Sequence, residues 1–506
     1  MNETNLSVIC IGAGPAGLTA AYLLSRQGVQ VTVLEQDPVY VGGISRTATY
    51  NGFAFDIGGH RFFSKSAEIE ALWTELLGDD FLVRPRKSRI YYRGKLFDYP
   101  IRALDALAKL GVCEAVRCVL SYLKAKAFAG ETPRTFEQWV TNQFGRRLFD
   151  IFFKTYTEKV WGMKCSEISA DWAAQRIKGL SLGKTIWHAL LPQRNGQPRD
   201  QIVKTLVNSF RYPRRGPGML WEAAAERIRD NGGEVLLGER VASLHWDGRA
   251  QRWSVVATAQ DGAERRLYCD HVISSMPMRE LVRAIHPAPS NAVAEAAEGL
   301  RYRDFLVVAL IVKDRRLFDD NWLYIHDAGV KVGRIQNFKS WSPEMVPAPD
   351  LNCYGLEYFC FEGDGLWTSS DAELVDLARE ELVTLGLAAR DDIVDGTAVR
   401  QRKAYPVYDD GYQERVDTIR VELEAAYPAL HLVGRNGMHK YNNQDHAMMT
   451  AMLTAKNIML GRRAFDVWRV NQDAEYHEAG EAGRDAVLAG EPAAHATAGR
   501  MVPARI

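Results

Sequence analysis

The sequence lacks paired cysteines and any cluster of residues with metal-binding spacing. Its seven cysteines stand at positions 10, 113, 118, 165, 269, 353 and 360, without a CxxC pair and without histidine partners. A disulfide framework and a zinc site both need a denser pattern. We therefore interpret the cysteines as buried free thiols in a reducing compartment, because free cysteine is among the most buried residue types. No metal centre is expected.

The sequence also lacks an excess of charge of one sign and a long hydrophobic run. Lys and Arg number 63, as do Asp and Glu, so no global field favours nucleic acid or an acidic membrane surface. The N-terminus has no basic region followed by a cleavage site, and no stretch approaches about 18 uncharged apolar residues. We expect a cytoplasmic protein that binds neither nucleic acid nor membrane, and in which any anion site is local.

The sequence does contain enough apolar material for a large core. Hydrophobic residues make up 47% of the 506 residues, and a chain of this length is expected to form two or three lobes. Residues 6–11 form an apolar run of strand length, followed by GAGPAG, a helical pattern through Arg26, and a second run, VQVTVLE. This order predicts a β-turn-α-β unit and an α/β fold of the Rossmann type.

The nucleotide-binding domain is predicted to be discontinuous. Apolar residues recur at helical spacing over about 66–126 and 136–184, whereas 232–277 has the pattern of strands joined by turns at Asp247-Gly248 and Asp261-Gly262. Strand-like runs follow at 305–312, 322–326 and 352–361. We assign 1–65, 210–300 and 425–465 to this domain, 66–195 to a mainly helical insert, and 300–424 to a mixed-sheet substrate domain. Residues 474–506 are expected to be a mobile tail.

A glycine motif follows the first predicted strand. Gly12, Gly14 and Gly17 fit GxGxxG: the first permits a tight turn, the second lets backbone approach a pyrophosphate, and the third allows close helix packing. The helix start, which includes Ala16, offers free N–H groups and a positive dipole end. Glu35 ends the second strand, where a carboxylate can accept both ribose hydroxyls. The pattern indicates FAD or NAD and not NADP.

Further blocks resemble the FAD-binding oxidases of the amine-oxidase and mutase superfamily. GGISRT contributes Gly43 and Arg46, and FDIGGHRFF contributes Gly59 and His60, which in that superfamily lie against the isoalloxazine ring. LVGRNGMHKYNNQDH predicts a strand, a glycine turn and a helix whose N-terminus faces the flavin. The resemblance makes FAD the expected cofactor. It adds these cofactor contacts: Val241, Gly434, Arg435, Asn443 and Gln444.

Blocks from residue 6 to about 459 resemble more specifically the UDP-galactopyranose mutases. They include TFEQWV with YTEKVWGM and AAQRI, FRYPRRGPGMLWEA, WLYIHD with GRIQNFKSWSP, and GRNGMHKYNNQDH. The resemblance implies an isomerase that interconverts the pyranose and furanose forms of a nucleotide-diphosphate sugar, for polysaccharide or glycoconjugate biosynthesis. In that family N5 of reduced FAD attacks the anomeric carbon without net redox change, so reduced FAD is the active form.

The same resemblance assigns the substrate contacts. Arg176 in AAQRI and Arg334 in GRIQNF match the two arginines that bind the diphosphate, a task that suits the guanidinium fork. Together with His60 they are the expected catalytic residues. Tyr405 and Tyr441 match tyrosines that donate their hydroxyls to the same phosphates. Asp445 lies where the family motif meets the flavin and the sugar. The full expected substrate-binding set is Arg176, Arg334, Tyr405, Tyr441, Trp161, Trp322 and Tyr324.

Base, sugar and reaction class stay open. The family's uracil-binding segment is poorly matched by RIYYRGKLFDYP, and Thr157 replaces an Asn near the sugar pocket, so UDP-, dTDP- and GDP-hexoses are all candidate substrates. An electron donor such as NAD(P)H or a reductase is the expected second partner, and the chain is either a monomer or an oligomer. The alternative function is a flavin oxidase or desaturase of the amine-oxidase or protoporphyrinogen-oxidase type, since the fold alone does not choose. A third candidate is a flavin-binding protein without turnover.

Overall fold

The chain begins with the β-turn-α-β unit that the glycine motif predicts. The structure is a computed structural model that describes residues 6–99, 101, 103–128, 133–170 and 209–471. Strands β1 (Ser7–Ile11) and β2 (Gln30–Glu35) pair in parallel and are connected by helix α1 (Pro15–Ser25). Every residue of β1 is buried, as expected for the centre of a parallel sheet with both faces covered.

Five parallel strands form the nucleotide sheet, in the order β20–β13–β1–β2–β9. The added strands are β9 (Glu234–Leu237), β13 (His271–Ser274) and β20 (Leu430–Leu432). Distant parts of the chain therefore lie side by side in one sheet. This arrangement confirms the predicted α/β fold with a discontinuous Rossmann-type domain.

Two layers cover this sheet. On one face Val8, Cys10 and Val33 belong to a core shared with α1, α10 (Gly218–Asp230) and α17 (Gln444–Leu460). On the other face Ile9 and Leu34 pack against a second sheet, ordered β12–β11–β10–β14. Successive residues of a strand point to opposite faces, which explains the alternation along β1. The second sheet consists of β10 (Arg240–Asp247), β11 (Arg252–Thr258), β12 (Glu264–Cys269) and β14 (Ile285–His286), joined by the two predicted turns.

A third, mixed sheet has the order β19–β15–β18–β17–β16–β6–β7. Its strand β15, second in this order, is buried over its whole length except at the last residue, and helix α15 (Asp371–Thr384) covers one side. The strands predicted at 305–312, 322–326 and 352–361 are β15, β16 and β18. The sheet consists of β6 (Ser88–Tyr92), β7 (Lys95–Asp98), β15 (Tyr302–Lys313), β16 (Trp322–Ile325), β17 (Arg334–Asn337), β18 (Leu351–Cys360) and β19 (Ile393–Pro406).

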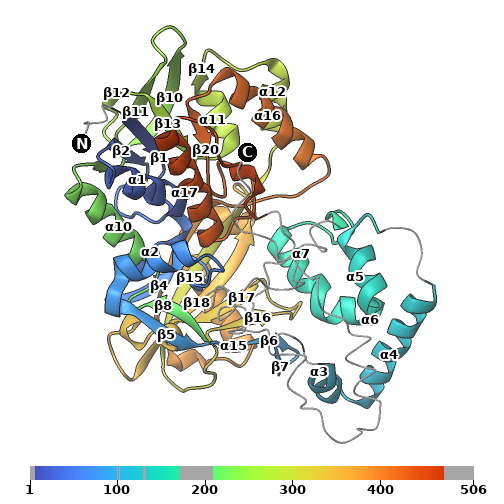
Figure 1. The fold of residues 1–506 in the computed structure, drawn as a ribbon. Coiled ribbons are helices and arrows are strands. Elements are labelled where there is room, and N and C mark those ends of the chain that lie inside the picture. The colour runs from blue at the N-terminus through green and yellow to red at the C-terminus, as the bar shows by residue number, and fades with distance from the viewer. Residues whose placement is uncertain (1–5, 100, 102, 129–132, 171–208, 472–506) are drawn as a thin grey trace, which may run out of the picture.

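Helices α3 to α7 of the predicted insert form a lobe that projects beside the third sheet, whereas α2 (Ala67–Leu77), at the start of the insert, packs on the main body (Figure 1). The helical spacing over 66–126 is wrong for 81–98, where the chain forms β5 (Phe81–Pro85), β6 and β7. These runs are short and rich in aromatic residues, and their pairing with distant strands outweighs the helical pattern. The lobe consists of α3 (Ala103–Leu110), α4 (Val112–Ala127), α5 (Phe136–Phe144), α6 (Arg146–Phe149) and α7 (Thr155–Trp161).

The remaining elements connect these layers. A hairpin of β3 (Thr47–Tyr50) and β4 (Phe53–Asp56) leads from the nucleotide sheet to the third sheet, and β5 pairs with β8 (Ser209–Pro213). The other helices are α2 (Ala67–Leu77), α11 (Met278–Ala284), α12 (Asn291–Glu298), α13 (Phe338–Trp341), α14 (Gly365–Thr368) and α16 (Tyr412–Ala426). The predicted tail at 474–506 lies outside the described residues.

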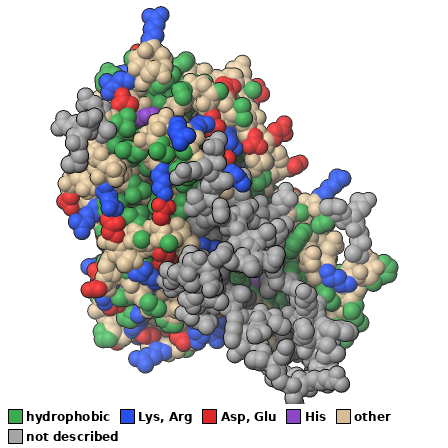
Figure 2. All heavy atoms as spheres, viewed as in Figure 1, with side chains coloured by type: hydrophobic (Ala, Val, Ile, Leu, Met, Phe, Trp, Pro, Cys, Tyr) green, Lys and Arg blue, Asp and Glu red, His purple; other side chains and the backbone are tan. Residues whose placement is uncertain are grey.

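Most cysteines are buried, and the surface carries charge of both signs. All seven thiols are unpaired, and six are buried, with Cys113 exposed. Basic and acidic side chains both occur over the visible described surface (Figure 2). Among the described helices, none has the length and apolar character needed to cross a membrane. The described part of the chain also holds no group of three His, Cys, Asp or Glu placed to bind a metal ion.

A buried carboxyl at the end of β4 makes the stability of the fold depend on pH. Asp56 is fully buried, accepts a hydrogen bond from Thr47 Oγ1 at 3.1 Å and a second from the Tyr212 hydroxyl. Burial raises the pKa of Asp56 to about 8. The folded chain therefore holds a proton that the unfolded chain releases near pH 4.

We expect the free energy of unfolding to fall as pH rises from about 4 to about 8, by at most about 1.4 kcal/mol per pH unit from Asp56. The stabilisation is complete below the unfolded pKa and is lost as pH passes the folded pKa. Asp56→Asn keeps a neutral, isosteric side chain and should flatten this slope. Urea unfolding from pH 4.5 to 9 measures the dependence of the unfolding free energy on pH. The control is Asp395→Asn, which changes a half-buried carboxylate that accepts a hydrogen bond from Tyr50. An unchanged slope in Asp56→Asn would contradict the prediction.

Candidate functional site

A cavity of about 740 Å³ lies at the carboxyl ends of β1, β2, β13 and β20. Ligands of open α/β sheets bind at this edge, where neighbouring strands diverge. The cavity continues past the nucleotide sheet to the third sheet, so one space borders the predicted cofactor contacts and several predicted substrate contacts. Arg and Lys outnumber Asp and Glu nine to five among the residues that line it. Such a lining suits anionic ligands.

The glycine loop, residues 12–17, has the geometry that its motif predicts. Gly12 adopts φ +93°, a conformation that side chains disfavour. A Cβ atom on Gly17 would lie 1.8 Å from the carbonyl oxygen of Gly12, so this position needs glycine for packing within the protein. A Cβ on Gly14 would meet no atom within 4 Å, because it would point into open space. Ala16 follows and lines the same cavity.

Glu35 connects the end of β2 to the glycine loop. Its carboxylate accepts from the backbone N–H of Ala13 at 2.7 Å and from that of Asp37 at 2.9 Å. Burial raises the pKa of Glu35, and the two backbone donors oppose that effect. The carboxylate lies in the cavity lining near Val241 of β10, the other predicted contact of the adenosine end.

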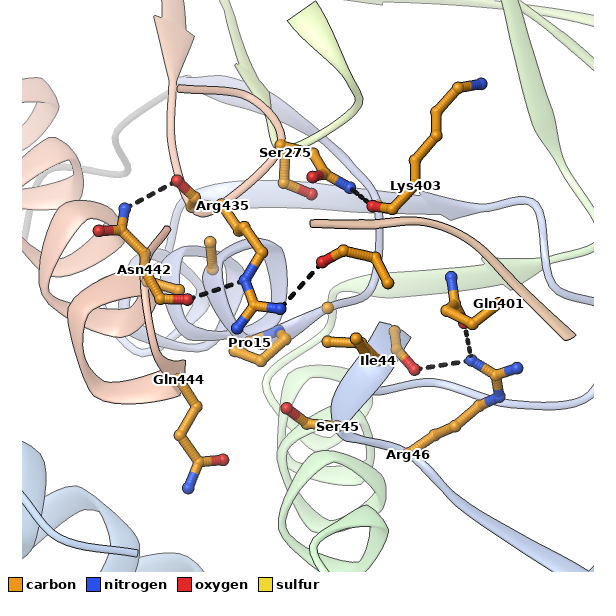
Figure 3. A pocket seen from close by; sticks show the side chains of 18 of the residues that line it. Pro15, Ile44, Ser45, Arg46, Ser275, Gln401, Lys403, Arg435, Asn442 and Gln444 are labelled. Carbon is orange, nitrogen blue, oxygen red and sulfur yellow. Dashed lines mark hydrogen bonds between the residues drawn. The ribbon is translucent and has the colours of Figure 1, made fainter. Parts of the chain in front are cut away.

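Arg46 follows the turn at Gly43 and points toward Gln401 (Figure 3). Its Nη1 donates to the carbonyl oxygen of Gly43 at 2.9 Å and also to the side chain of Gln401 on β19. Gly43 adopts φ +56°, and its Cβ would lie 3.4 Å from the Cα of Gly14. Arg46 therefore ties the turn to the third sheet on one side of the cavity. Burial lowers the pKa of its guanidinium.

The loop at residues 58–60 closes the floor of the cavity. Gly58 adopts φ +98°, and a Cβ on Gly59 would lie 3.2 Å from the Trp322 ring, which leaves little space for a side chain. His60 Nε2 lies 2.9 Å from the carbonyl oxygen of Ile44 and 3.2 Å from that of Ile57. Both partners are acceptors, so Nε2 carries the proton. Burial, with the charge of Arg435 as the next cause, lowers the pKa of His60 to about 4.

The turn that precedes α17 places Arg435 at the centre of the cavity (Figure 3). Its Nε donates to the carbonyl oxygen of Asn442 at 2.9 Å and its Nη1 to that of Ala404 at 3.0 Å. Gly434, with φ +79°, begins the turn. Asn443 and Gln444 form the start of α17 and line the cavity, as does Asp445.

The residues present fit FAD. The space in front of Gly14, and an α1 N-terminus without a side-chain cap, leave backbone N–H groups and room for a pyrophosphate. The buried Oε1 atom of Gln444 has no hydrogen-bond partner within the described chain, as expected for a group that meets a polar ligand edge. Glu35 would hold the ribose, the glycine loop the diphosphate, and residues 58–60 with 434–444 the ring system.

Arg334 on β17 borders the far end of the same cavity. Its Nε donates to Glu357 Oε2 at 2.6 Å and its Nη2 lies 2.5 Å from the same oxygen. Glu357 is fully buried on the neighbouring strand and also accepts from Gln336 Nε2 at 2.6 Å. Burial opposes the charge of Arg334, but Glu357 beside it raises the guanidinium pKa. One carboxylate thus fixes one edge of the guanidinium, while Nη1 has no partner in the described chain.

Tyr405 and Tyr441 form a stacked pair in the cavity wall. Their ring centroids lie 5.5 Å apart at an interplanar angle of 13°. The guanidinium of Arg435 lies 5.3 Å from the Tyr405 centroid and 5.0 Å from that of Tyr441. Arg334, Arg435 and the two tyrosines therefore converge on one region, although they come from strands and turns up to about a hundred residues apart.

The other predicted substrate contacts lie at different depths. Trp322 lines the cavity, with the guanidinium of Arg61 3.6 Å from its ring centroid. Trp161 and Tyr324 do not line it in the described structure. Trp161 lies behind Tyr441, with centroids 6.4 Å apart, and Tyr324 packs edge-on against Trp322 at 5.9 Å. Arg176 lies outside the described residues.

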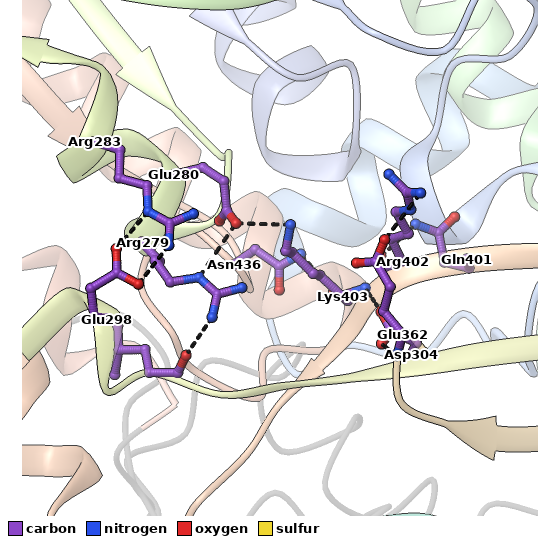
Figure 4. A network of polar contacts seen from close by, with 11 residues as sticks. Arg279, Glu280, Arg283, Glu298, Asp304, Glu362, Gln401, Arg402, Lys403 and Asn436 are labelled. Carbon is purple, nitrogen blue, oxygen red and sulfur yellow. Dashed lines mark hydrogen bonds and ion pairs between the residues drawn. The ribbon is translucent and has the colours of Figure 1, made fainter. Parts of the chain in front are cut away.

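Several residues of the site were not predicted from the sequence. Glu357 is the most informative, since a single Glu within the apolar run NCYGLEYFCF is a signal for a buried ion pair. Lys403 and Glu280 form an ion pair at 2.8 Å beside Asn436, and this network closes another side of the cavity (Figure 4). No local pattern could have placed them together, because β19, α11 and the 434–442 turn meet only in the folded chain.

Comparison with known proteins places this geometry in a family. The family model described as flavin containing amine oxidoreductase matches residues 15–459. Protoporphyrinogen oxidase 2, chloroplastic/mitochondrial, of Arabidopsis thaliana is 39% identical over 463 residues, which cover 85% of this chain and 89% of that protein. A probable UDP-galactopyranose mutase of Klebsiella pneumoniae is 27% identical over 179 residues, 34% of this chain and 44% of that protein.

A solved structure has the same fold as this chain. A crystal structure of reduced UDP-galactopyranose mutase superposes with a TM-score of 0.75 at 23% identity, covering 90% of this chain and 94% of that one. The chain spans only 9% and 44% of the first two curated relatives that it matches. The family, the fold and the fitted cavity together show that FAD is the cofactor. The chain belongs to the flavin-containing amine oxidoreductases.

Proposed function

We propose that this enzyme interconverts the pyranose and furanose forms of a nucleotide-diphosphate sugar while its FAD is reduced. The observation that carries the proposal is the convergence of Arg334, Arg435, Tyr405 and Tyr441 in the FAD cavity. Guanidinium groups and tyrosine hydroxyls are the donors that a diphosphate needs. The likeness to a mutase in fold and over 179 residues supports the same function.

The two cations at the far end of the cavity support a second anionic ligand. Nine Arg or Lys line the cavity against five Asp or Glu, and Arg283, Arg334 and Arg402 pair with carboxylates outside the lining. Among the described residues, backbone carbonyls and not a carboxylate hold Arg435, so its charge is available to a ligand. Arg334 keeps part of its guanidinium toward the cavity while Glu357 fixes the rest. Both cations would stabilise a diphosphate that leaves the sugar.

The bound reduced flavin would supply the nucleophile for the anomeric carbon. The chain itself then has three tasks: to hold the diphosphate through Arg334 and the tyrosine pair, to exclude water with Trp322, and to keep residues 58–60 against the ring. His60 serves the third task as a neutral donor to two backbone carbonyls. Arg176 and the electron donor, NAD(P)H or a reductase, are proposed parts of the same reaction.

The proposal is tested with the purified holoenzyme, reduced with dithionite under anaerobic conditions. UDP-, dTDP- and GDP-hexoses in the pyranose form are incubated separately and analysed by chromatography for a furanose isomer. The oxidised holoenzyme is the control and should form no product. Isomerisation by reduced enzyme alone supports the mutase and identifies its base and sugar. Absence of an isomer with every sugar overturns it.

An oxidase of the protoporphyrinogen type is the second candidate, because the relative with that name matches 85% of this chain. An oxidase would transfer a hydride to the flavin and pass the electrons to oxygen. It predicts that an apolar or porphyrinogen substrate bleaches the oxidised flavin, and that air restores the flavin absorbance with formation of hydrogen peroxide. If the enzyme is a mutase, a nucleotide sugar should neither bleach the oxidised flavin nor lead to hydrogen peroxide.

The pH profile should show no ionisation of His60 above pH 5.5, because the pKa of about 4 keeps the ring neutral. His60→Gln should lower kcat by about tenfold through a displaced 58–60 loop. The shape of kcat/KM against pH, from 5.5 to 9, should match that of the unchanged enzyme. Loss of an inflection near neutral pH in the variant would show instead that His60 acts as an acid or base.

A further inference from the structure

Helix α7 lies behind the cavity wall that contains Tyr441, and two of its aromatic side chains pack against residues around that wall. Tyr156 stacks on His326 with centroids 5.2 Å apart and meets Tyr324 edge-on at 5.3 Å. Trp161, at the other end of the helix, lies 6.4 Å from Tyr441 of the tyrosine pair. The position of α7 therefore determines how the wall behind Tyr441 and Arg334 is packed.

A buried cation lies at the carboxyl end of α7. Arg303 on β15 is only 5% exposed, and its guanidinium donates to the carbonyl oxygens of Val160 at 3.2 Å, Lys159 at 3.3 Å and Phe359 at 2.7 Å. It also lies 4.1 Å from the Phe361 ring centroid. In the described part of the chain it forms no ion pair with a carboxylate. Burial lowers the pKa of Arg303 to about 10, so the group stays charged at neutral pH.

This contact has the polarity that a helix end requires. The last carbonyl groups of a helix lack partners within the helix and carry the negative end of its dipole. Arg303 supplies donors and positive charge to two of them, and Phe359 connects the same guanidinium to β18. The helix ends at Gly162, where a Cβ atom would lie 2.5 Å from Arg303 Cζ. Glycine is thus needed here both for φ +63° and for the approach of Arg303.

A second cation fixes the same helix from another side. Lys159 Nζ donates to the carbonyl oxygens of Asp327 at 2.6 Å, Val332 at 3.0 Å and Ile325 at 3.3 Å. These acceptors belong to the end of β16 and the loop that leads to β17, which carries Arg334. A π-helical turn, Asp150–Lys154, precedes α7 and separates it from α6. The helix is therefore attached to the third sheet by cations at backbone carbonyls.

We propose that Arg303 is a positioning residue for the substrate site: it fixes the end of α7 to the third sheet and so holds Trp161 against Tyr441. The identity of the ligand in this inference rests on the proposed function. The position of the helix is independent of that function. The Arg303 side chain does not line the cavity, although its backbone pairs with Tyr405 across β15 and β19, and we assign the effect of its guanidinium to the helix contact.

The test compares Arg303→Met, Arg303→Lys and Arg400→Met as holoenzymes. Arg400 on β19 of the same sheet also donates to two backbone carbonyls, those of Trp367 and Ser369, and in addition pairs with Asp371; it is the control from a part of the sheet that does not contact α7. Hydrogen exchange of the amides of 155–162 reports on α7. FAD content and the melting temperature report on the fold, and the affinity for UDP, followed by flavin absorbance, reports on the site.

Arg303→Met should speed amide exchange in α7 and raise the dissociation constant for UDP and the KM for the sugar about tenfold, with FAD content unchanged and kcat altered less. Arg303→Lys keeps the charge but loses the forked set of guanidinium donors, so its α7 exchange rate and its affinity for UDP should lie between those of Arg303→Met and the unchanged enzyme. Arg400→Met should show the same α7 amide exchange and the same affinity for UDP as the unchanged enzyme. Unchanged α7 exchange in Arg303→Met, or an equal effect of Arg400→Met, overturns the proposal. If the unchanged enzyme binds no nucleotide, the proposed function fails, while α7 exchange still decides the role of Arg303.

Discussion

Replacing Arg334 by Met should weaken binding of a nucleoside diphosphate by about 10- to 100-fold, because charge-assisted hydrogen bonds contribute about 1.5–3 kcal/mol each. FAD content should not change, since Arg334 lies at the third sheet and not at the glycine loop. The KM for the nucleotide sugar should rise and kcat should fall, as expected for a group that stabilises the leaving diphosphate. Titration with UDP and steady-state kinetics of the reduced enzyme measure both effects.

The buried partner of Arg334 requires a second variant. Arg334→Met leaves Glu357, which is fully buried, without its cation, and removing one member of a buried pair is itself destabilising. Arg334→Met combined with Glu357→Gln removes both charges and keeps an amide oxygen for Gln336. We expect the double variant to recover melting temperature but not affinity. Recovery of affinity would mean that Arg334 has a structural role only.

Alanine at Gly14 and alanine at Gly17 should have opposite consequences for fold and cofactor. At Gly14 the added methyl group meets no protein atom within 4 Å and occupies the space in front of the loop. The apoprotein should fold normally, and FAD affinity should fall roughly 100-fold because the diphosphate loses hydrogen bonds worth about 1.5–3 kcal/mol. Flavin fluorescence on titration of apoprotein measures the loss.

Gly17→Ala is the contrasting variant. Its Cβ would lie 1.8 Å from the Gly12 carbonyl oxygen, so backbone must shift whether or not a cofactor is present. We expect a lower melting temperature in the apoprotein and little soluble holoenzyme, because overpacking typically costs about 1–3 kcal/mol or more. Equal melting temperatures for the two apoprotein variants would contradict the distinction drawn between the cofactor space and the helix contact.

The parts of the site that could be predicted from the sequence are those built by local chain geometry. Gly12, Gly14 and Gly17 lie within one turn, and Glu35 ends the next strand, so spacing alone places them together. The structure gives each the conformation or contact that the motif requires. Residues that meet across two strands have no fixed separation in the sequence. Arg334 and Glu357 are opposite each other only because β17 and β18 pair in that register.

Depth within the fold was the other feature that residue type could not predict. Trp322, Tyr324 and Trp161 are all large aromatic residues in blocks shared with the mutases, yet only Trp322 lines the cavity. Tyr324 follows Trp322 by two positions on β16 and so lies on the same face of the strand, but it packs toward Tyr99 and Tyr156. Likewise 81–98 forms strands because distant partners exist for them, a condition that no local window contains.

The order of strands in the nucleotide sheet determines when the cofactor can be captured during synthesis. The glycine loop emerges from the ribosome first, but Gly434, Arg435 and the start of α17 follow more than four hundred residues later. Until then β13 has no β20 partner, and α17, one of the helices that pack on α1, does not exist. A nascent chain therefore lacks the part of the cavity lining at 434–447, and we expect it to bind flavin fully only after α17 has been made. Truncation anywhere before the end of α17 would yield a chain that has the glycine motif intact and no complete place for the cofactor.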